Sequence, residues 1–243
     1  PESAVAIAGS KNLQNLQSLK MYRNKIGDEG IKALVETEEL PSLKSLRLAH
    51  NDIGPEGARF VAGSDQLNGL TALVLAENKL GDEGLKYLAG STKLSTLEIL
   101  DLRKNGITDE GAIEFAKSPN FPNVQKVDLT ANRLTDIGKD ALKGFLILNL
   151  LRRRIKETDE GMVCDLSNLG IGDLECGFIA DFEGFSNLTQ VYLELNKITE
   201  EGICKLAESK NMESVTLLSL DRNKIGDKGI DCIVESQYFK KLT

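Results

Sequence analysis

The side chains that could do chemistry are few and scattered. Catalysis by a side chain needs a nucleophile or base with a neighbour that orients it. The only histidine, His50, stands alone directly before Asn51. A single histidine of this kind is most often a surface residue. The sequence therefore predicts a protein that is not an enzyme and has no catalytic residue.

The cysteines and acidic residues do not suggest a metal or cofactor. The cysteines form no CxxC pair and have no clustered histidines beside them, which argues against a zinc site: Cys164, Cys176, Cys204 and Cys232. The segment 221–226 resembles the start of a calcium loop, but its twelfth position is Cys232, where a bidentate glutamate is needed. The glycines follow a regular period and form no phosphate-binding fingerprint. We expect no metal and no cofactor.

Composition narrows the class of partner. The 243 residues carry a net charge of −7, which disfavours nucleic-acid binding and suits a protein partner with a basic patch. No apolar run is long enough to cross a bilayer, so no membrane association is expected. No cysteine cluster marks a disulfide-bonded cap at either end, which favours a reducing, cytoplasmic location.

A 27-residue repeat organises the chain. Segments of the form LxxLxLxxN begin at residues 16, 43, 70, 97 and 124, and again at 188 and 215. Their alternating apolar residues have the period of a strand: Leu19 and Met21 point inward, and Lys20 and Tyr22 point to the other face. After each asparagine, an apolar residue and then Gly or Thr predict a helix start, with the Gly or Thr as its N-cap. The glycines three places later indicate close packing of neighbouring helices.

The consensus LxxLxLxxNxIGDEG resembles the leucine-rich repeat family, in particular its ribonuclease-inhibitor-like branch, over essentially the whole chain. This resemblance implies an α/β fold, a right-handed horseshoe solenoid with a parallel sheet on its concave face and helices on its convex face. It also implies that one column of asparagines is buried and bonds the backbone of the turns. The column comprises Asn24, Asn51, Asn78, Asn105, Asn132, Asn196 and Asn223, with Leu169 in its place in one degenerate repeat.

The domain prediction is one leucine-rich repeat domain over 1–243, with an irregular insertion at about 144–160. A degenerate repeat begins near Gly161. Either the insertion lengthens a helix or loop, or residues 145–153 form a degenerate strand. Within it, Arg152, Arg153 and Arg154 are either a solvated turn or a docking point for an acidic partner. The chain starts without Met and the repeat phase reaches both ends, so we expect a fragment of a longer native chain.

The outward positions of the predicted strands vary between repeats, and such positions carry function in solenoids. Their N-terminal part is basic, and their centre and C-terminal part are acidic. Asp101, Asp128 and Asp165 are expected on adjacent strands, either as a docking strip for basic side chains or as ordinary surface. The predicted partner-binding residues are Lys20, Tyr22, Arg23, Arg47, His50, Asp101, Arg103, Asp128, Asp165, Tyr192, Glu194 and Asp221.

Three functions are open at this stage. The first is a protein-interaction scaffold that binds a partner on the concave face. The second is a regulator of small GTPases, since Ran GTPase-activating proteins have a similar repeat, although no catalytic motif can be matched. The third is the ligand-sensing repeat arm of a larger receptor, or a pathogen effector. The partner and the oligomeric state are unknown.

Overall fold

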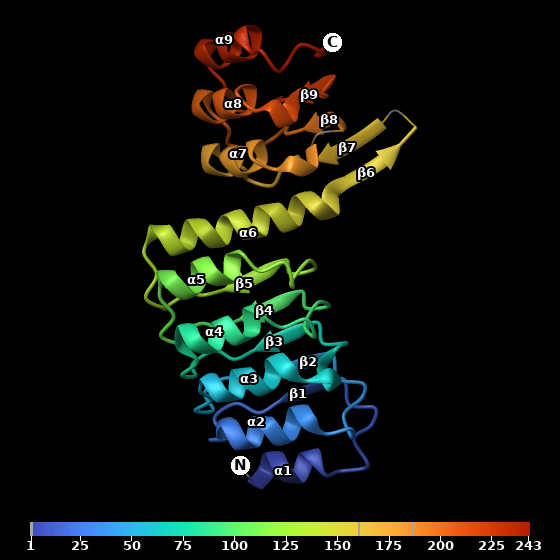
Figure 1. The fold of residues 1–243 in the computed structure, drawn as a ribbon, viewed down its shortest axis with the longest axis vertical. Coiled ribbons are helices and arrows are strands. Elements are labelled where there is room, and N and C mark those ends of the chain that lie inside the picture. The colour runs from blue at the N-terminus through green and yellow to red at the C-terminus, as the bar shows by residue number, and fades with distance from the viewer. Residues whose placement is uncertain (1, 160, 186) are drawn as a thin grey trace. The chain divides into compact units, whose positions relative to one another are not determined.

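The computed structural model describes residues 2–159, 161–185 and 187–243 of the chain. It divides into two compact units, Pro1–Leu146 and Ile147–Thr243, which share the helix α6 (Asp136–Arg154). In each unit strands alternate with helices along the chain (Figure 1). The single domain expected over 1–243 stays a prediction.

The first unit is built on a five-stranded parallel sheet in the order β1-β2-β3-β4-β5. The pairing register equals the repeat, so that Leu19 lies beside Leu46, and Leu46 lies beside Leu73. Helices follow the strands on one side of this sheet (Figure 1). The strands are β1 (Ser18–Lys20), β2 (Ser45–Arg47), β3 (Ala72–Val74), β4 (Ile99–Asp101) and β5 (Lys126–Asp128). The helices are α1 (Glu2–Ala8), α2 (Gly27–Glu36), α3 (Pro55–Gly63), the 3-10 turn η1 (Asp65–Leu67), α4 (Gly81–Ala89) and α5 (Asp109–Ala116).

The second unit holds a four-stranded sheet in the order β6-β7-β8-β9. Three of these strands are parallel, and β6 pairs antiparallel with β7. The strands are β6 (Ile155–Thr158), β7 (Gly161–Asp165), β8 (Leu188–Tyr192) and β9 (Leu217–Ser219). The helices are α7 (Asp173–Ala180), η2 (Glu183–Phe185), α8 (Glu200–Ala207), η3 (Lys210–Met212) and α9 (Asp227–Glu235).

The repeat solenoid predicted from the sequence is confirmed as an α/β fold with parallel strands. Leu19 and Met21 are buried, while Lys20 and Tyr22 are exposed on the other face. The irregular segment is helical up to Arg154 and then forms β6, so the alternative strand over 145–153 is wrong. Long unbranched side chains and leucines favour a helix there, and the three arginines lie at its C-terminus, where positive charge suits the helix dipole.

The predicted caps are correct in most repeats and wrong in two. Gly54, Thr108 and Thr199 precede their helices as N-caps. Gly27 and Gly81 are instead the first helical residues, with φ of 63° and 57°. This left-handed conformation favours glycine, so conformation rather than capping explains the residue type at these two positions.

The asparagine column joins neighbouring repeats, and Asn51, Asn78, Asn105 and Asn196 are buried as predicted, whereas Asn24 is exposed and Asn132 and Asn223 are half-buried. The Asn51 side chain accepts a hydrogen bond from the Asn24 N–H at 2.7 Å and donates to the Met21 carbonyl. Asn78 and Asn105 repeat this pattern with the turns before them. In the second unit the Asn196 side chain accepts a hydrogen bond from the backbone N–H of Leu169 at 3.0 Å. Leu169 takes the place of an asparagine in its own repeat and has no side-chain amide to continue the column. Each buried asparagine of the column thus satisfies backbone groups of two consecutive turns.

The residue directly before each of these positions has a left-handed backbone. It is not glycine in any described repeat: Arg23, His50, Glu77, Lys104, Ala131, Asn168, Leu195 and Arg222 have φ between 52° and 59°. Left-handed residues with a side chain are uncommon because the Cβ crowds the following carbonyl. The hydrogen bonds of the asparagine column hold the turn in this conformation.

A second set of bonds joins the helix starts. The Asp173 carboxylate at the start of α7 accepts from the Thr199 N–H at 2.8 Å, the Thr199 hydroxyl at 2.7 Å and the Gly202 N–H at 3.0 Å. Asp28, Asp82 and Asp109 bond the following repeat in the same way. A Cβ on Gly202 would lie 2.4 Å from the Asp173 oxygen, which confirms the close packing inferred for this glycine column.

A third set of bonds lies where each helix ends. The Thr37 hydroxyl donates to the Ala8 carbonyl at 2.6 Å, and the Ser91 hydroxyl donates to the Ala62 carbonyl at 2.6 Å. Ser118, Ser209 and Ser236 make the same bond to the preceding repeat. The turns and both helix ends are therefore tied to the neighbouring repeat by side chains that point away from the open strand face.

The asparagine column can be tested at its buried centre. Asn105→Ala removes the acceptor of the buried Leu80 N–H and one of the two side-chain donors to each of the Leu75 and Leu102 carbonyls, and we expect the protein to lose roughly 1–3 kcal/mol of unfolding free energy. Urea titration measures this loss. The matched control is Asn24→Ala, at an exposed position where the side-chain amide donates only to Tyr22 among the described residues and a loss below about 1 kcal/mol is expected. Equal losses at the two positions would contradict the role of the column.

The aspartate bonds predict a pH-dependent contribution to stability. Partial burial raises the pKa of Asp173, but the bonds from Thr199 and Gly202 outweigh it and hold that pKa below its ordinary value. The stabilisation is thus present above the pKa of an unfolded aspartate, about 3.9, and is lost as the pH falls through the lower folded value. We expect Asp173→Asn to cost about 1–2 kcal/mol at pH 7 and much less at pH 2.

Denaturant titrations at the two pH values measure this difference. Asp227→Asn is the control, because Asp227 also lies in the first turn of a helix but is exposed. A cost for Asp173→Asn that does not change with pH would contradict the assigned carboxylate role.

Candidate functional site

The open face of the first sheet carries a row of side chains that runs from positive to negative charge. Strand pairing places Lys20 beside Arg47, Arg47 beside Val74, Val74 beside Asp101, and Asp101 beside Asp128. Each belongs to the alternate position that points away from the buried leucines. Like charges on neighbouring strands destabilise a sheet, so neither the two cations nor the two aspartates gain stability from each other.

One arginine holds the acidic end of this row together. The Arg103 guanidinium bonds both oxygens of Asp101, at 2.9 and 2.8 Å, and its Nε lies 3.5 Å from Asp128. The hydrogen bond to Asp101 and the charge of that residue raise the pKa of Arg103. Burial raises the pKa of Asp128, but bonds from Thr130 and the nearby Arg103 lower it overall. Asp128 therefore favours its charged form beside Arg103.

A shallow hollow of about 280 Å³ lies over the same strands. The apolar part of its lining comes from Val74, Ile99 and Leu100, and the charged part from Arg47, Asp101, Arg103, Lys126 and Asp128. Ile99 is 38% exposed, which is unusual for an isoleucine inside a strand. This hollow combines exposed apolar surface with fixed charge of both signs, which are the features of a protein-binding surface.

Aromatic and basic side chains gather beside the basic end of the row. The rings of Tyr22 and His50 lie 5.9 Å apart, and the Arg23 guanidinium lies 5.3 Å from the Tyr22 ring. His50 is 3.6 Å from Glu77, which also meets Lys104 at 3.5 Å. Tyr22 is 55% exposed, so its ring is available as an anchor for a partner.

The other four predicted residues lie on the second unit and are more constrained. Glu194 accepts from the Ser167 hydroxyl at 2.5 Å and the Ser219 hydroxyl at 2.6 Å, and these bonds lower its pKa. The Tyr192 hydroxyl bonds Gln190 at 2.9 Å. Asp165 and Asp221 are exposed. The structure thus places the twelve predicted residues on the strands of two sheets or in the turns that follow those strands.

The predicted column of three neighbouring aspartates is wrong. Asp101 and Asp128 are neighbours, but Asp165 is not on a strand next to Asp128. The physical reason is that α6 continues to Arg154 and the chain then returns as β6, which pairs with β7 along one edge. Asp165 lies instead beside Tyr192 of β8.

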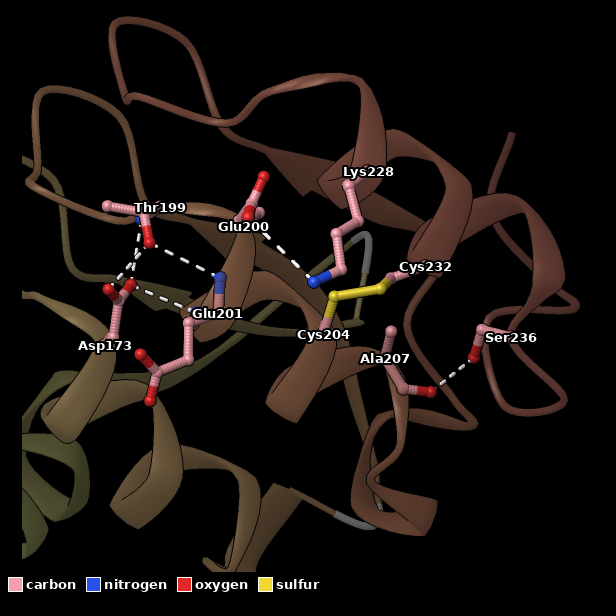
Figure 2. The surroundings of a disulfide bond; sticks show 10 residues. Asp173, Thr199, Glu200, Glu201, Cys204, Ala207, Lys228, Cys232 and Ser236 are labelled. Carbon is pink, nitrogen blue, oxygen red and sulfur yellow. Dashed lines mark hydrogen bonds and ion pairs between the residues drawn. A yellow bond between two sulfur atoms is a disulfide. The ribbon is translucent and has the colours of Figure 1, made fainter.

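Two of the four cysteines form a disulfide that was not predicted from the sequence. Cys204 on α8 and Cys232 on α9 form a disulfide between helices of consecutive repeats (Figure 2). The sequence contained a signal for it, because 28 residues, one more than the repeat, separate them on predicted helices. Cys164 and Cys176 are buried free thiols, and burial raises the pKa of each to about 12. These two are therefore unreactive side chains of the core.

Within residues 2–159, 161–185 and 187–243, no three His, Cys, Asp or Glu side chains gather as a metal site. In the same part of the chain, no helix is both long and apolar enough to cross a bilayer. On the strand faces, Asp101 pairs with Arg103, Glu77 with Lys104, and Glu194 with Ser219.

The repeated strand and helix, joined by buried asparagines, define an α/β solenoid with one open sheet face in each unit. The chain is built of leucine-rich repeats: the family described as Leucine Rich repeat matches residues 12–35, 39–62, 68–89, 93–116 and 211–234. No protein of curated description matches the sequence significantly.

Solved structures share the fold at low sequence identity. The tropomodulin C-terminal domain of Caenorhabditis elegans is 15% identical with a TM-score of 0.50, covering 63% of this chain and 95% of its own. A structure described as leiomodin-1 actin-binding site 2 is 17% identical with a TM-score of 0.50, covering 63% of this chain and 91% of its own. At these identities the likeness shows the fold alone.

The pairing around Arg103 can be tested directly. Arg103→Ala removes the positive charge beside Asp128, so the pKa of Asp128 should rise, while unfolding free energy should fall by no more than about 1 kcal/mol because the pair is exposed. A nuclear magnetic resonance titration of side-chain carboxyl groups measures the pKa. Asp165, whose pKa depends on Ser167 and Arg154, should not change. An unchanged Asp128 would contradict the assigned geometry.

Proposed function

We propose that this chain is a protein-interaction scaffold that binds another protein through the open strand face of its first unit, and that it is not an enzyme. The observation that carries the proposal is the row from Lys20 to Asp128, in which exposed cations and half-buried aspartates lie in strand register on the open face. A helix in every repeat also supports assignment to the ribonuclease-inhibitor-like branch of the family.

The row is not needed to hold the repeats together. The backbone of the row pairs the strands, but most side-chain bonds between repeats come from the asparagine column, the aspartates at helix starts and the hydroxyls at helix ends, which lie outside this row. Surface ion pairs contribute little stability. The side chains of the row are therefore free to serve recognition.

Charge spacing indicates the chemistry of the partner. The centre of the basic pair on β1 and β2 lies three strand spacings, about 14 Å, from the centre of the acidic pair on β4 and β5. A partner with acidic groups at one end of a surface and basic groups about 14 Å away would match both. Ile99 and Tyr22 supply apolar and aromatic contact area between and beside these charges.

One partner can be tested by name. A structure similar in fold is described as an actin-binding site of leiomodin-1. Actin is therefore a reasonable first partner to test. The low identity supports only the choice of probe.

Charge reversal provides the binding test. We expect Arg47→Glu and Asp128→Lys each to weaken binding of the partner at least tenfold, because each places like charges across the interface. Affinity capture from the source organism identifies the partner, with purified actin as a separate probe, and calorimetry with the purified partner measures the change.

Asp221→Lys on the second unit is the matched control and should bind as the wild type does. Thermal melts establish that all variants are folded. Wild-type affinity in both Arg47→Glu and Asp128→Lys would overturn the proposed interface, and loss in Asp221→Lys alone would move it to the second unit.

A further inference from the structure

The disulfide joins two helices on the side of the repeats opposite to the strands. Cys204 and Cys232 have their Cα atoms 5.2 Å apart and are both half-buried. Figure 2 shows the bond between α8 and α9, close to Lys228 and Glu200. It has no part in the proposed binding face of the first unit.

The two helices that this bond joins differ in how much of their surface is buried. The helix α9 buries only Gly229, whereas α8 buries Gly202, Ile203, Leu206 and Ala207. Ile230 is 51% exposed and Val234 is 78% exposed. Elements with few buried apolar contacts open locally at low free-energy cost.

Among the described residues, few polar side chains tie α8 to the repeat of α9. The Ser236 hydroxyl donates to the Ala207 carbonyl at 2.5 Å, and Lys228 lies 3.9 Å from the exposed Glu200. Such an exposed ion pair contributes little. A covalent bond at this point therefore adds a constraint to the packing of Cys232 and Ile233 against the core.

The disulfide is within reach of a reductant. Both cysteines line an open hollow of about 370 Å³ together with Glu208, Glu235, Ser236 and Tyr238. Thiol–disulfide exchange requires this access, since a thiolate must approach one sulfur along the S–S bond. Cys164 and Cys176 are fully buried and are not accessible in the folded chain.

We propose that Cys204 and Cys232 form a redox modification site, whose substrate is a dithiol reductant and whose reduction releases α9 from α8. A thiolate of the dithiol attacks one sulfur and forms a mixed disulfide, and the other protein sulfur leaves as a thiolate and takes up a proton. The second thiol of the reductant then displaces the first protein sulfur. The products are two protein thiols and one oxidised reductant, so two electrons pass to the protein.

The state of the Cys204–Cys232 pair depends on the redox conditions around the chain. A disulfide that persists requires an oxidising compartment, whereas a cytoplasmic pool of reductants would keep the pair as thiols. The helix α9 is therefore held in the first environment and loosened in the second. The strand face of the first unit is unaffected in either.

The test uses the whole chain purified without reductant and then treated with dithiothreitol. Thiol labelling under native conditions should count two new thiols, mapped by mass spectrometry to Cys204 and Cys232. Hydrogen exchange of the α9 amides should then accelerate at least tenfold, while α4 and α5 of the first unit keep their rates.

The double variant Cys204→Ser, Cys232→Ser is the matched control. It should show fast α9 exchange from the start and no response to dithiothreitol. If this variant fails to fold, the comparison of wild type with and without reductant still decides the matter. Free thiols at both positions in the untreated protein, or α9 exchange unchanged by reduction, would overturn the inference.

Discussion

The bond between a buried asparagine and the backbone of the preceding turn is the constraint on which the rest of the structure depends. The side chains of Asn51, Asn78 and Asn105 each bond both a carbonyl and an N–H group of the preceding repeat. Because this bond recurs at the repeat spacing, it sets the strand register, and the register in turn aligns Lys20, Arg47, Val74, Asp101 and Asp128. The alignment of these side chains on the open face thus depends on buried hydrogen bonds in the turns that follow the strands.

The side chains that stabilise the repeats are different from those that we propose recognise a partner. Aspartates at helix starts and hydroxyls at helix ends reinforce the asparagine column, and none of these side chains belongs to the open strand face. In a repeat protein, stability is approximately a sum of each repeat and its interfaces with its neighbours. Local weakness, as at α9, therefore need not spread to the binding face, and one covalent bond there acts only on its own repeat.

Much of this architecture could be predicted from the sequence, because a fixed period specifies both strand pairing and the inward residues. Leu19, Met21 and the asparagine column are where periodicity placed them. The neighbourhood of Asp165 could not be predicted, since it depends on whether 144–158 is helix, loop or strand, and the repeat carries no information on that segment. The two hydrogen bonds from Arg103 to Asp101 could not be predicted either, because they depend on the side-chain rotamer of the arginine. The Cys204–Cys232 pair was predictable from its spacing once each cysteine was placed on a helix.

The left-handed residues before each asparagine have a consequence for engineering. Each non-glycine residue there carries a backbone cost of roughly 1–2 kcal/mol, and the structure repeats that cost at Arg23, His50, Glu77 and Lys104 among others. Asparagine or glycine adopts the same conformation more readily. A designer could therefore stabilise the scaffold turn by turn at these positions without altering a core side chain, and could choose the turns farthest from the Tyr22 ring so that the recognition chemistry stays intact.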